Sequence, residues 1–356
     1  MKGFLKRLIK LVLFFGVGIL FVYLSVKDMT PEDFEILKAS AAQATKGSAW
    51  IFLALSFLAG VTAHYIRALR SRQLLQPLGY EVRRSTSFIA VMVCYISNLA
   101  FPRLGEILRC TTLRQLERVP FEKTLGSVLT ERVIDMIFLL LILLAAIFMN
   151  TDLLNTLMVD TDPATGLEIS LGEKLSSVGY GFLHSYKFFI AFGVLAIGCL
   201  VIYWTRARWT KVPFFVKIKD FVVGMWQGLL SVKDLKNPTL FVIYTFVIWI
   251  LYFLQSYFTF QAFDFLSGIG FVMVFTVFAI GNIGFVVGPG GLGAYPLLAA
   301  GTFILYGIDY NAGLAAGWVS WGVQTVMVLS VGFVALCTLS LMKKNKKNNG
   351  ESLSDE

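Results

Sequence analysis

Charge is scarce in this sequence. Only 15% of its 356 residues are charged, and the stretch 136–149 carries no charge at all. Hydrophobic residues make up 57% of the chain, and the mean hydropathy is +0.73. A water-soluble domain of this length cannot bury that much apolar surface. The composition therefore excludes a soluble globular protein and predicts a polytopic membrane protein, whose spans each need about 20 apolar residues.

The residues of metal and redox sites are also few. The chain has two histidines, His64 and His184, and four scattered cysteines without a CxxC pair, so we expect no metal site and no disulfide framework. No GxxxxGK[ST] motif is present, and we expect no nucleotide or other cofactor. The formal charge of +9 is explained by cytoplasmic Lys and Arg, and no basic soluble domain exists, so we expect no nucleic-acid partner.

Nine apolar stretches are candidate spans. The first follows a basic N-terminus but lacks a small-x-small cleavage site, so we interpret it as a retained span and not a signal peptide. The candidates are 8–26, 49–69, 87–102, 124–149, 186–204, 239–263, 269–287, 297–308 and 312–341.

The loops between these stretches alternate in charge. Residues 66–86 carry five arginines against Glu81, whereas 150–185 carry five acids against Lys174. Because cytoplasmic loops are enriched in Lys and Arg, the pattern predicts which side each loop occupies. The expected cytoplasmic segments are 1–10, 66–86, 205–238 and the C-terminal tail, and the expected outer segments are 27–48 and 150–185.

Nine full crossings would place the two basic termini on opposite sides, so some stretches cannot cross. The segment 87–118 breaks at Pro102, and 269–308 is interrupted by "GNIGFVVGPGGLGAYP" at 281–296. We interpret both as re-entrant hairpins. The expected fold is all-α, with about six full spans and two broken re-entrant hairpins. The membrane domain would cover residues 1–342, and 343–356 would form a basic, then polar, disordered cytoplasmic tail.

The two hairpins form a predicted inverted repeat. Each precedes a full span, at 124–149 and 312–341, and they enter from opposite sides. Such repeats place a substrate site near the membrane midplane, and the N–H groups that begin half-helices favour an anion. A chance likeness of two Pro/Gly breaks is the alternative. The expected binding residues at the breaks are Asn98, Pro102, Gly105, Asn282, Pro289, Gly290, Gly291, Gly293 and Tyr295.

The segment "FPRLGEILRC", residues 101–110, places charge beside the first break. On a helix that begins near Arg103, Glu106 and Arg109 follow at intervals of three and share one side. Since charge at this depth is costly, we favour a phosphate clamp by Arg103 or Arg109, with Glu106 holding or gating it. The alternative is a cytoplasmic turn with solvated charges.

The segment "TERVID", residues 130–135, adds a second charged group. Glu131 and Asp135 share a helix face, and Arg132 would face the first hairpin and complete a polar cavity. The alternative is an interfacial helix start that orients the span. On the span at 49–69, we expect Arg67 and Arg70 to extend to lipid headgroups and His64 to be a core histidine with its hydrogen bonds satisfied.

Three segments together resemble one known family. "SNLAFPRLGEILRC", "LTERVIDMIFLL" and "VVGPGGLGAYP" are similar, in this order, to segments of the lysylphosphatidylglycerol synthase transmembrane family. The resemblance covers about residues 8–340. It implies a flippase-like membrane protein of bacteria or archaea. The similar membrane part of the best-known family members is implied to move aminoacylated phosphatidylglycerol between leaflets. In the best-known members a soluble C-terminal domain carries the aminoacyl transfer. Only fourteen residues follow Met342, so we expect that domain, and synthase activity, to be absent.

The leading hypothesis is a translocator of a phospholipid or lipid-linked anionic substrate in the cell membrane, with both termini cytoplasmic and no assigned catalytic residue. A separate enzyme would make the substrate, and an oligomer is compatible with the sequence. An alternative is a membrane enzyme that modifies lipid headgroups, with Glu131, Asp135 or His64 as acid or base. A third hypothesis is a structural or regulatory membrane subunit.

Overall fold

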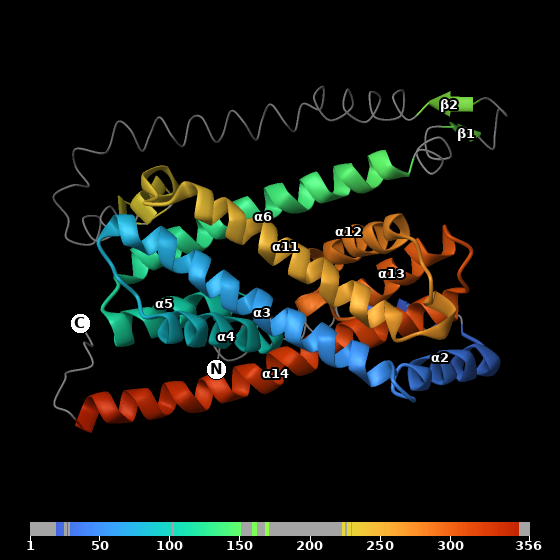
Figure 1. The fold of residues 1–356 in the computed structure, drawn as a ribbon, viewed down its shortest axis with the longest axis horizontal. Coiled ribbons are helices and arrows are strands. Elements are labelled where there is room, and N and C mark those ends of the chain that lie inside the picture. The colour runs from blue at the N-terminus through green and yellow to red at the C-terminus, as the bar shows by residue number, and fades with distance from the viewer. Residues whose placement is uncertain are drawn as a thin grey trace, which may run out of the picture. The chain divides into compact units, whose positions relative to one another are not determined.

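The computed structural model describes residues 19–24, 27, 29–101, 103–150, 159–161, 168–170, 223–224, 226–228 and 230–348. Most of the expected first span, the expected span at 186–204 and Pro102 lie outside these residues. Residues 1–146 and 224–356 form one compact unit, and 147–223 form another. In the second unit, β1 (Val159–Thr161) and β2 (Glu168–Ser170) pair antiparallel. Everything below concerns the first unit, which is helical (Figure 1).

Four helices in the described residues are long and apolar enough to cross a membrane. They are α3 (Ala49–Leu75), α6 (Phe121–Met149), α11 (Pro238–Gln261) and α14 (Tyr310–Asn348). Each coincides with an expected span, so the multi-pass helical prediction is confirmed. Helices α3 and α11 pack along each other, where the hydroxyl of Ser56 donates to the carbonyl of Gln255 at 2.8 Å.

The first expected hairpin is present as two helices around a break. Helix α4 (Arg84–Ala100) ends at the extended residue Phe101, and α5 (Leu104–Glu117) begins after Arg103, whose φ is 62°. The helices approach closely at Gly105, where a Cβ atom would stand only 2.0 Å from the carbonyl oxygen of Cys94. Only glycine permits this approach.

The second hairpin repeats this arrangement. Helix α12 (Phe271–Val287) leads through the short 3-10 helix η4 (Pro289–Gly291) into α13 (Ala294–Ile304). The turn uses positive φ at Gly290, Gly291 and Gly293, a conformation that favours glycine. A Cβ at Gly284 would stand 2.6 Å from the backbone nitrogen of Tyr295, so α12 and α13 also pack backbone to backbone.

The two breaks meet inside the unit. A Cβ at Gly290 would lie 3.0 Å from Cδ2 of Leu99, the residue before the last one of α4. Helix α14 packs against both α4 and α13, and a Cβ at Gly332 would contact Ile96 at 2.7 Å. Large apolar side chains on α6 and α14 point outward, among them Leu141 and Phe333, as expected for surfaces that face lipid.

The ends of the unit carry polar contacts. Helix α2 (Pro31–Gln43) begins with a capping box, in which backbone and hydroxyl hydrogen bonds from Thr30 hold the pKa of Asp33 below its ordinary value. Asp33 also accepts a hydrogen bond from Asn311 of α14 at 2.7 Å. Helix α14 continues to Asn348, so helix extends into the segment 343–356 assigned to the tail; residues 349–356 are not described. Short 3-10 helices complete the path at Gln76–Leu78, Ser231–Asp234 and Asp264–Leu266.

Candidate functional site

A cavity of about 400 Å³ lies where the two broken hairpins meet the long helices. Both hairpins line it: α4 contributes Tyr95, Asn98 and Leu99, and the second hairpin contributes Asn282, Phe285, Gly290 and Tyr295, among others. Helices α3, α6, α11 and α14 form the remaining walls. Its volume falls in the range of small-molecule sites, about 300–1,000 Å³.

Asp135 of α6 holds two arginines of α3. Its carboxylate accepts from Arg67 at 2.6 Å and from Arg70 at 2.8 Å. Arg67 also donates to the hydroxyl of Tyr252 at 3.2 Å, and Arg70 donates to Thr245 at 3.3 Å. Both arginine side chains are almost completely buried. The expectation that they extend to headgroups is wrong, because Asp135 turns them inward.

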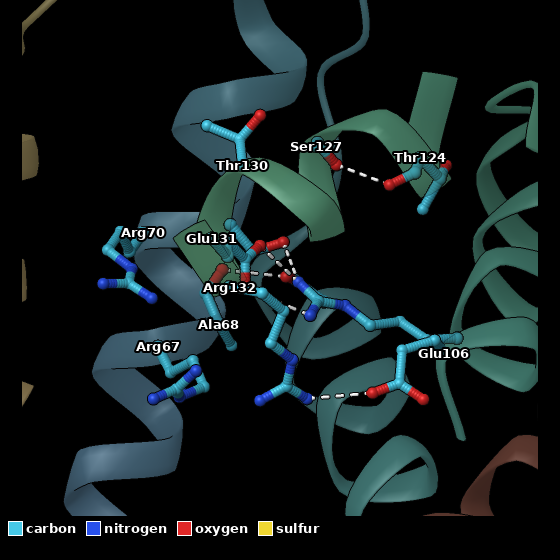
Figure 2. A network of polar contacts seen from close by, with 12 residues as sticks. Arg67, Ala68, Arg70, Glu106, Thr124, Ser127, Thr130, Glu131 and Arg132 are labelled. Carbon is cyan, nitrogen blue, oxygen red and sulfur yellow. Dashed lines mark hydrogen bonds and ion pairs between the residues drawn. The ribbon is translucent and has the colours of Figure 1, made fainter. Parts of the chain in front are cut away.

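Arg132 of α6 reaches toward the first hairpin, as predicted. Its guanidinium donates to Oε1 of Glu106 at 3.1 Å, and Figure 2 shows this bond beside Arg67 and Arg70. Asn98 supports the same carboxylate: its amide nitrogen donates to Glu106 at 3.3 Å, while its oxygen accepts from the backbone of Gly105 at 2.8 Å. The side chain of Arg132 is 41% exposed, whereas that of Glu106 is 19% exposed.

Arg109 is held by Glu131 and not by Glu106. The two form a two-point ion pair, with nitrogen–oxygen distances of 2.7 and 3.1 Å, and Arg109 also bonds Ser71 of α3. In Figure 2, dashed lines mark the bonds that the carboxylate of Glu131 accepts. Both side chains are buried, and neither lines the cavity. The pair joins α5 to α6, so Glu131 holds the first hairpin in position by a buried ion pair.

The charges of this cluster do not cancel. Four arginines (Arg67, Arg70, Arg109 and Arg132) face three carboxylates (Glu106, Glu131 and Asp135), which leaves one positive charge in excess. Arg132 is the most exposed of the four and lines the cavity. The excess arises at Asp135, which two arginines share, and one of these, Arg67, lines the cavity together with Arg132. A ligand in the cavity therefore meets a net positive charge.

The wall of the cavity also has polar residues without charge. His64 of α3 is 1% exposed and packs on Tyr95, with ring centroids 4.2 Å apart. Neither of its ring nitrogens has a hydrogen-bond partner among the described residues, so the expectation of a satisfied histidine is wrong. The buried indole nitrogen of Trp249 and hydroxyl of Thr325 also lack partners there. All three residues line the cavity.

Two neutral pairs also line the cavity. Gln255 donates to Gln324 at 2.6 Å, and the hydroxyls of Tyr295 and Ser320 are 3.0 Å apart. Among the described residues, no group of three or more His, Cys, Asp or Glu side chains is arranged to hold a metal ion. The site therefore offers hydrogen bonds and one net positive charge.

The model of one protein family matches residues 7–332, nearly the whole chain, and its description is the lysylphosphatidylglycerol synthase TM region. The chain belongs to the lysylphosphatidylglycerol synthase transmembrane family. No curated protein and no solved structure matches it. The family and the apolar helices together identify a multi-pass membrane protein with a lipid-related membrane domain.

In this family member, some residues expected at the site line the cavity and others support it. Arg103 caps α5 with an exposed side chain, and Gly105, Gly291 and Gly293 permit the turns and close helix contacts. Pro102 lies outside the described residues, as does the side chain of Pro289. The residues that line the cavity are Asn98, Arg132, Asp135, Asn282, Gly290 and Tyr295; those outside its lining are Arg103, Gly105, Glu106, Arg109, Glu131, Gly291 and Gly293.

Sequence reasoning missed the contribution of α11. Trp249, Tyr252, Gln255 and Ser256 all line the cavity. Their spacing of three and four residues places them on one helix face. That polar stripe in an otherwise apolar span was a usable signal, because polar groups inside a membrane span face protein or a cavity.

Proposed function

We propose that this protein is a flippase that moves a phospholipid or a lipid-linked anionic substrate between the leaflets of a bacterial or archaeal cell membrane. The observation that carries the proposal is the cavity between the two broken hairpins, with Arg132 exposed to it. A headgroup must be shielded from hydrocarbon as it crosses, because an unpaired charge at the bilayer centre costs at least about 2.5–3.5 kcal/mol. The cavity supplies such shielding.

The helical arrangement supports an inverted repeat. In each half, a hairpin with a Pro/Gly break precedes a long apolar helix: α4–α5 then α6, and α12–α13 then α14. With six full spans and two re-entrant hairpins, the two breaks would lie near the midplane. A repeat of this kind moves one half against the other around a fixed site. The contact of Leu99 with Gly290 would then be the pivot.

The cavity wall has a charged region and an apolar region, which fits a lipid with a polar headgroup and apolar acyl chains. The charged side presents Arg67, Arg132 and Asp135, while Leu99, Met136 and other apolar side chains line the remainder. A headgroup would occupy the polar region, and the acyl chains would remain along apolar surface. Such a division lets the polar group cross without removing the chains from lipid.

One observation favours a headgroup-modifying enzyme as a second candidate. His64 faces the cavity with two unpartnered nitrogens, as a general base would. However, the two carboxylates considered as alternative acids or bases are already engaged, Asp135 by two arginines and Glu131 by Arg109. Lipid mass spectrometry of vesicles incubated with the purified protein tests this candidate: a new lipid species that is lost in His64→Ala would support an enzyme.

The flippase proposal is tested with purified protein in liposomes. Fluorescent NBD-phosphatidylglycerol is distributed over both leaflets, and dithionite then quenches the outer label. Liposomes with protein should lose nearly all fluorescence, whereas empty liposomes should retain about half. Equal retention in both preparations, with correctly folded protein, would contradict lipid translocation.

A further inference from the structure

We propose that the cavity recognises a headgroup in which one anionic phosphate is bonded to a neutral polyhydroxyl group. Arg132 would bind the phosphate, and His64, Trp249 and Thr325 would bind hydroxyls. This inference rests on the proposed function and names the chemistry of its substrate. It also excludes a headgroup with a net positive charge.

The charge of the cluster selects against cations. Every carboxylate of the cluster already has an arginine partner: Asp135 holds Arg67 and Arg70, Glu131 holds Arg109, and Glu106 holds Arg132. A cationic headgroup would have to displace an arginine or face the excess positive charge. Both cost free energy in a region of low dielectric constant, so discrimination arises from repulsion as well as attraction.

Arg132 has the geometry of an anion ligand. Its guanidinium bonds one oxygen of Glu106 at 3.1 Å, but a guanidinium carries five N–H donors in a planar fork. The side chain is partly exposed and lines the cavity. It can therefore bind a phosphate without leaving Glu106, and arginine binds phosphate oxygens in pairs.

The neutral wall has donors and acceptors that nothing in the described chain satisfies. The indole of Trp249 is a donor, the hydroxyl of Thr325 is both donor and acceptor, and neutral His64 provides one of each. Buried polar groups are normally hydrogen-bonded, and each unpaired one costs about 1–3 kcal/mol. Three such residues from three helices in the wall of one cavity indicate a ligand that bonds them.

Hydroxyl groups fit this wall better than other headgroup substituents. A hydroxyl both donates and accepts, so it can pair with an indole N–H, an imidazole and another hydroxyl. A trimethylammonium group can do neither and would leave the wall unpaired. A site built for hydroxyls rejects ligands that lack them, because its own groups then remain unsatisfied.

Binding to the purified full-length protein in detergent tests the inference with short-chain lipids. The probes are dioctanoyl phosphatidylglycerol, which has phosphate and polyol; dioctanoyl phosphatidic acid, which lacks the polyol; and the phosphatidylcholine and lysyl-phosphatidylglycerol analogues. Phosphatidylglycerol should bind most tightly. Arg132→Gln should weaken both anionic lipids by about tenfold or more. Trp249→Phe should weaken phosphatidylglycerol about fivefold and leave phosphatidic acid unchanged.

Arg83→Gln is the matched control, because Arg83 is 62% exposed in a pair with Glu117 outside the cavity lining. The inference is overturned if phosphatidylcholine or the lysyl lipid binds as tightly as phosphatidylglycerol, or if both cavity variants bind like the wild type. If Arg132→Gln does not fold, the wild-type ranking and Trp249→Phe still decide.

Two further results separate this inference from the proposed function. In the first, glycerol 3-phosphate, which has no acyl chains, competes as tightly as the lipid, or selective binding occurs without flipping in liposomes. Either result supports the headgroup chemistry and contradicts the flippase. Flipping of every lipid at one rate, without selective binding, supports the flippase and overturns this inference.

Discussion

Arg109 and Glu131 form a two-point ion pair that joins the first hairpin to the long helix after it. Their closest nitrogen–oxygen distance is 2.7 Å, and both side chains are at least 96% buried. The pair is therefore a structural fastening. It explains how an arginine beside the helix break is tolerated in the protein interior, since a buried charge persists only when it is paired and hydrogen-bonded.

Loss of one partner of this pair should destabilise the protein. We expect Arg109→Ala or Glu131→Ala to cost about 3–5 kcal/mol, because each leaves an uncompensated buried charge. Thermal unfolding of the purified protein in detergent measures the loss. The double variant Arg109→Leu/Glu131→Leu should lose less than either single variant, because it leaves no unpaired charge.

Lys236→Ala is the control for this prediction. Lys236 forms an exposed pair with Glu81 at 3.5 Å, and such pairs contribute only about 0–1 kcal/mol. If the single variants at 109 and 131 unfold at the wild-type temperature, Arg109 is not a structural fastening. It would then be free to serve as the phosphate clamp that the sequence suggested.

The close contact at the first hairpin predicts that Gly105→Ala will fail to fold normally. Its new methyl group would stand 2.0 Å from the carbonyl oxygen of Cys94, so the backbones of α4 and α5 would have to separate. The comparison variant is Gly301→Ala, where a Cβ meets no atom within 4 Å. This helical position should be neutral or gain up to about 1 kcal/mol. Equal melting temperatures for both variants would contradict the packing described.

Much of the fold could be predicted from the sequence. The long apolar runs predicted where α3, α6, α11 and α14 begin to within about three residues, because spanning length and hydropathy are local properties. Helices α3 and α14 continue past the expected ends at 69 and 341, to Leu75 and Asn348. The breaks were also visible, since Pro102 and the glycines at 288–293 interrupt apolar runs. The pairing of the charged side chains could not be predicted, because it depends on which helices become neighbours in the fold.

The arginines of α3 illustrate that limit. Near the end of an apolar span, Arg67 and Arg70 have the pattern of side chains that reach for headgroups. They point inward only because Asp135, 68 residues after Arg67 and 65 after Arg70, packs opposite them. Likewise, Glu106 lies three residues before Arg109, yet it pairs with Arg132, 26 residues away. Local spacing predicted a shared face but not the partner.

Single cysteines test the expected topology in a background without native cysteines. We expect an impermeant thiol reagent applied outside cells to label Thr161→Cys and Leu305→Cys but not Arg118→Cys. Leu305 is 53% exposed at the end of α13 and avoids Gly307, whose φ of 77° resists substitution. Labelling at 118, or protection at 305, would contradict the two re-entrant hairpins.

His64→Phe should separate stability from transport. Phenylalanine preserves the aromatic packing on Tyr95 and removes two buried nitrogens that have no partner among the described residues. We therefore expect an unchanged or higher melting temperature together with slower lipid translocation. This combination is typical of a side chain that serves function and lowers the stability of the fold. A melting temperature well below that of the wild type would show that His64 serves packing alone.

The most direct test of the account is lipid translocation by Arg132→Gln in liposomes, compared with wild type, Arg132→Lys and the exposed control Arg83→Gln. Each variant is first matched to the wild type by melting temperature and amount reconstituted. If Arg132 carries the charge that receives the phosphate, Arg132→Gln should flip NBD-phosphatidylglycerol at least about tenfold more slowly, and Arg132→Lys should recover part of the rate. Arg83→Gln should match the wild type. A folded Arg132→Gln that flips lipid at the wild-type rate would contradict the cavity as the path of the headgroup.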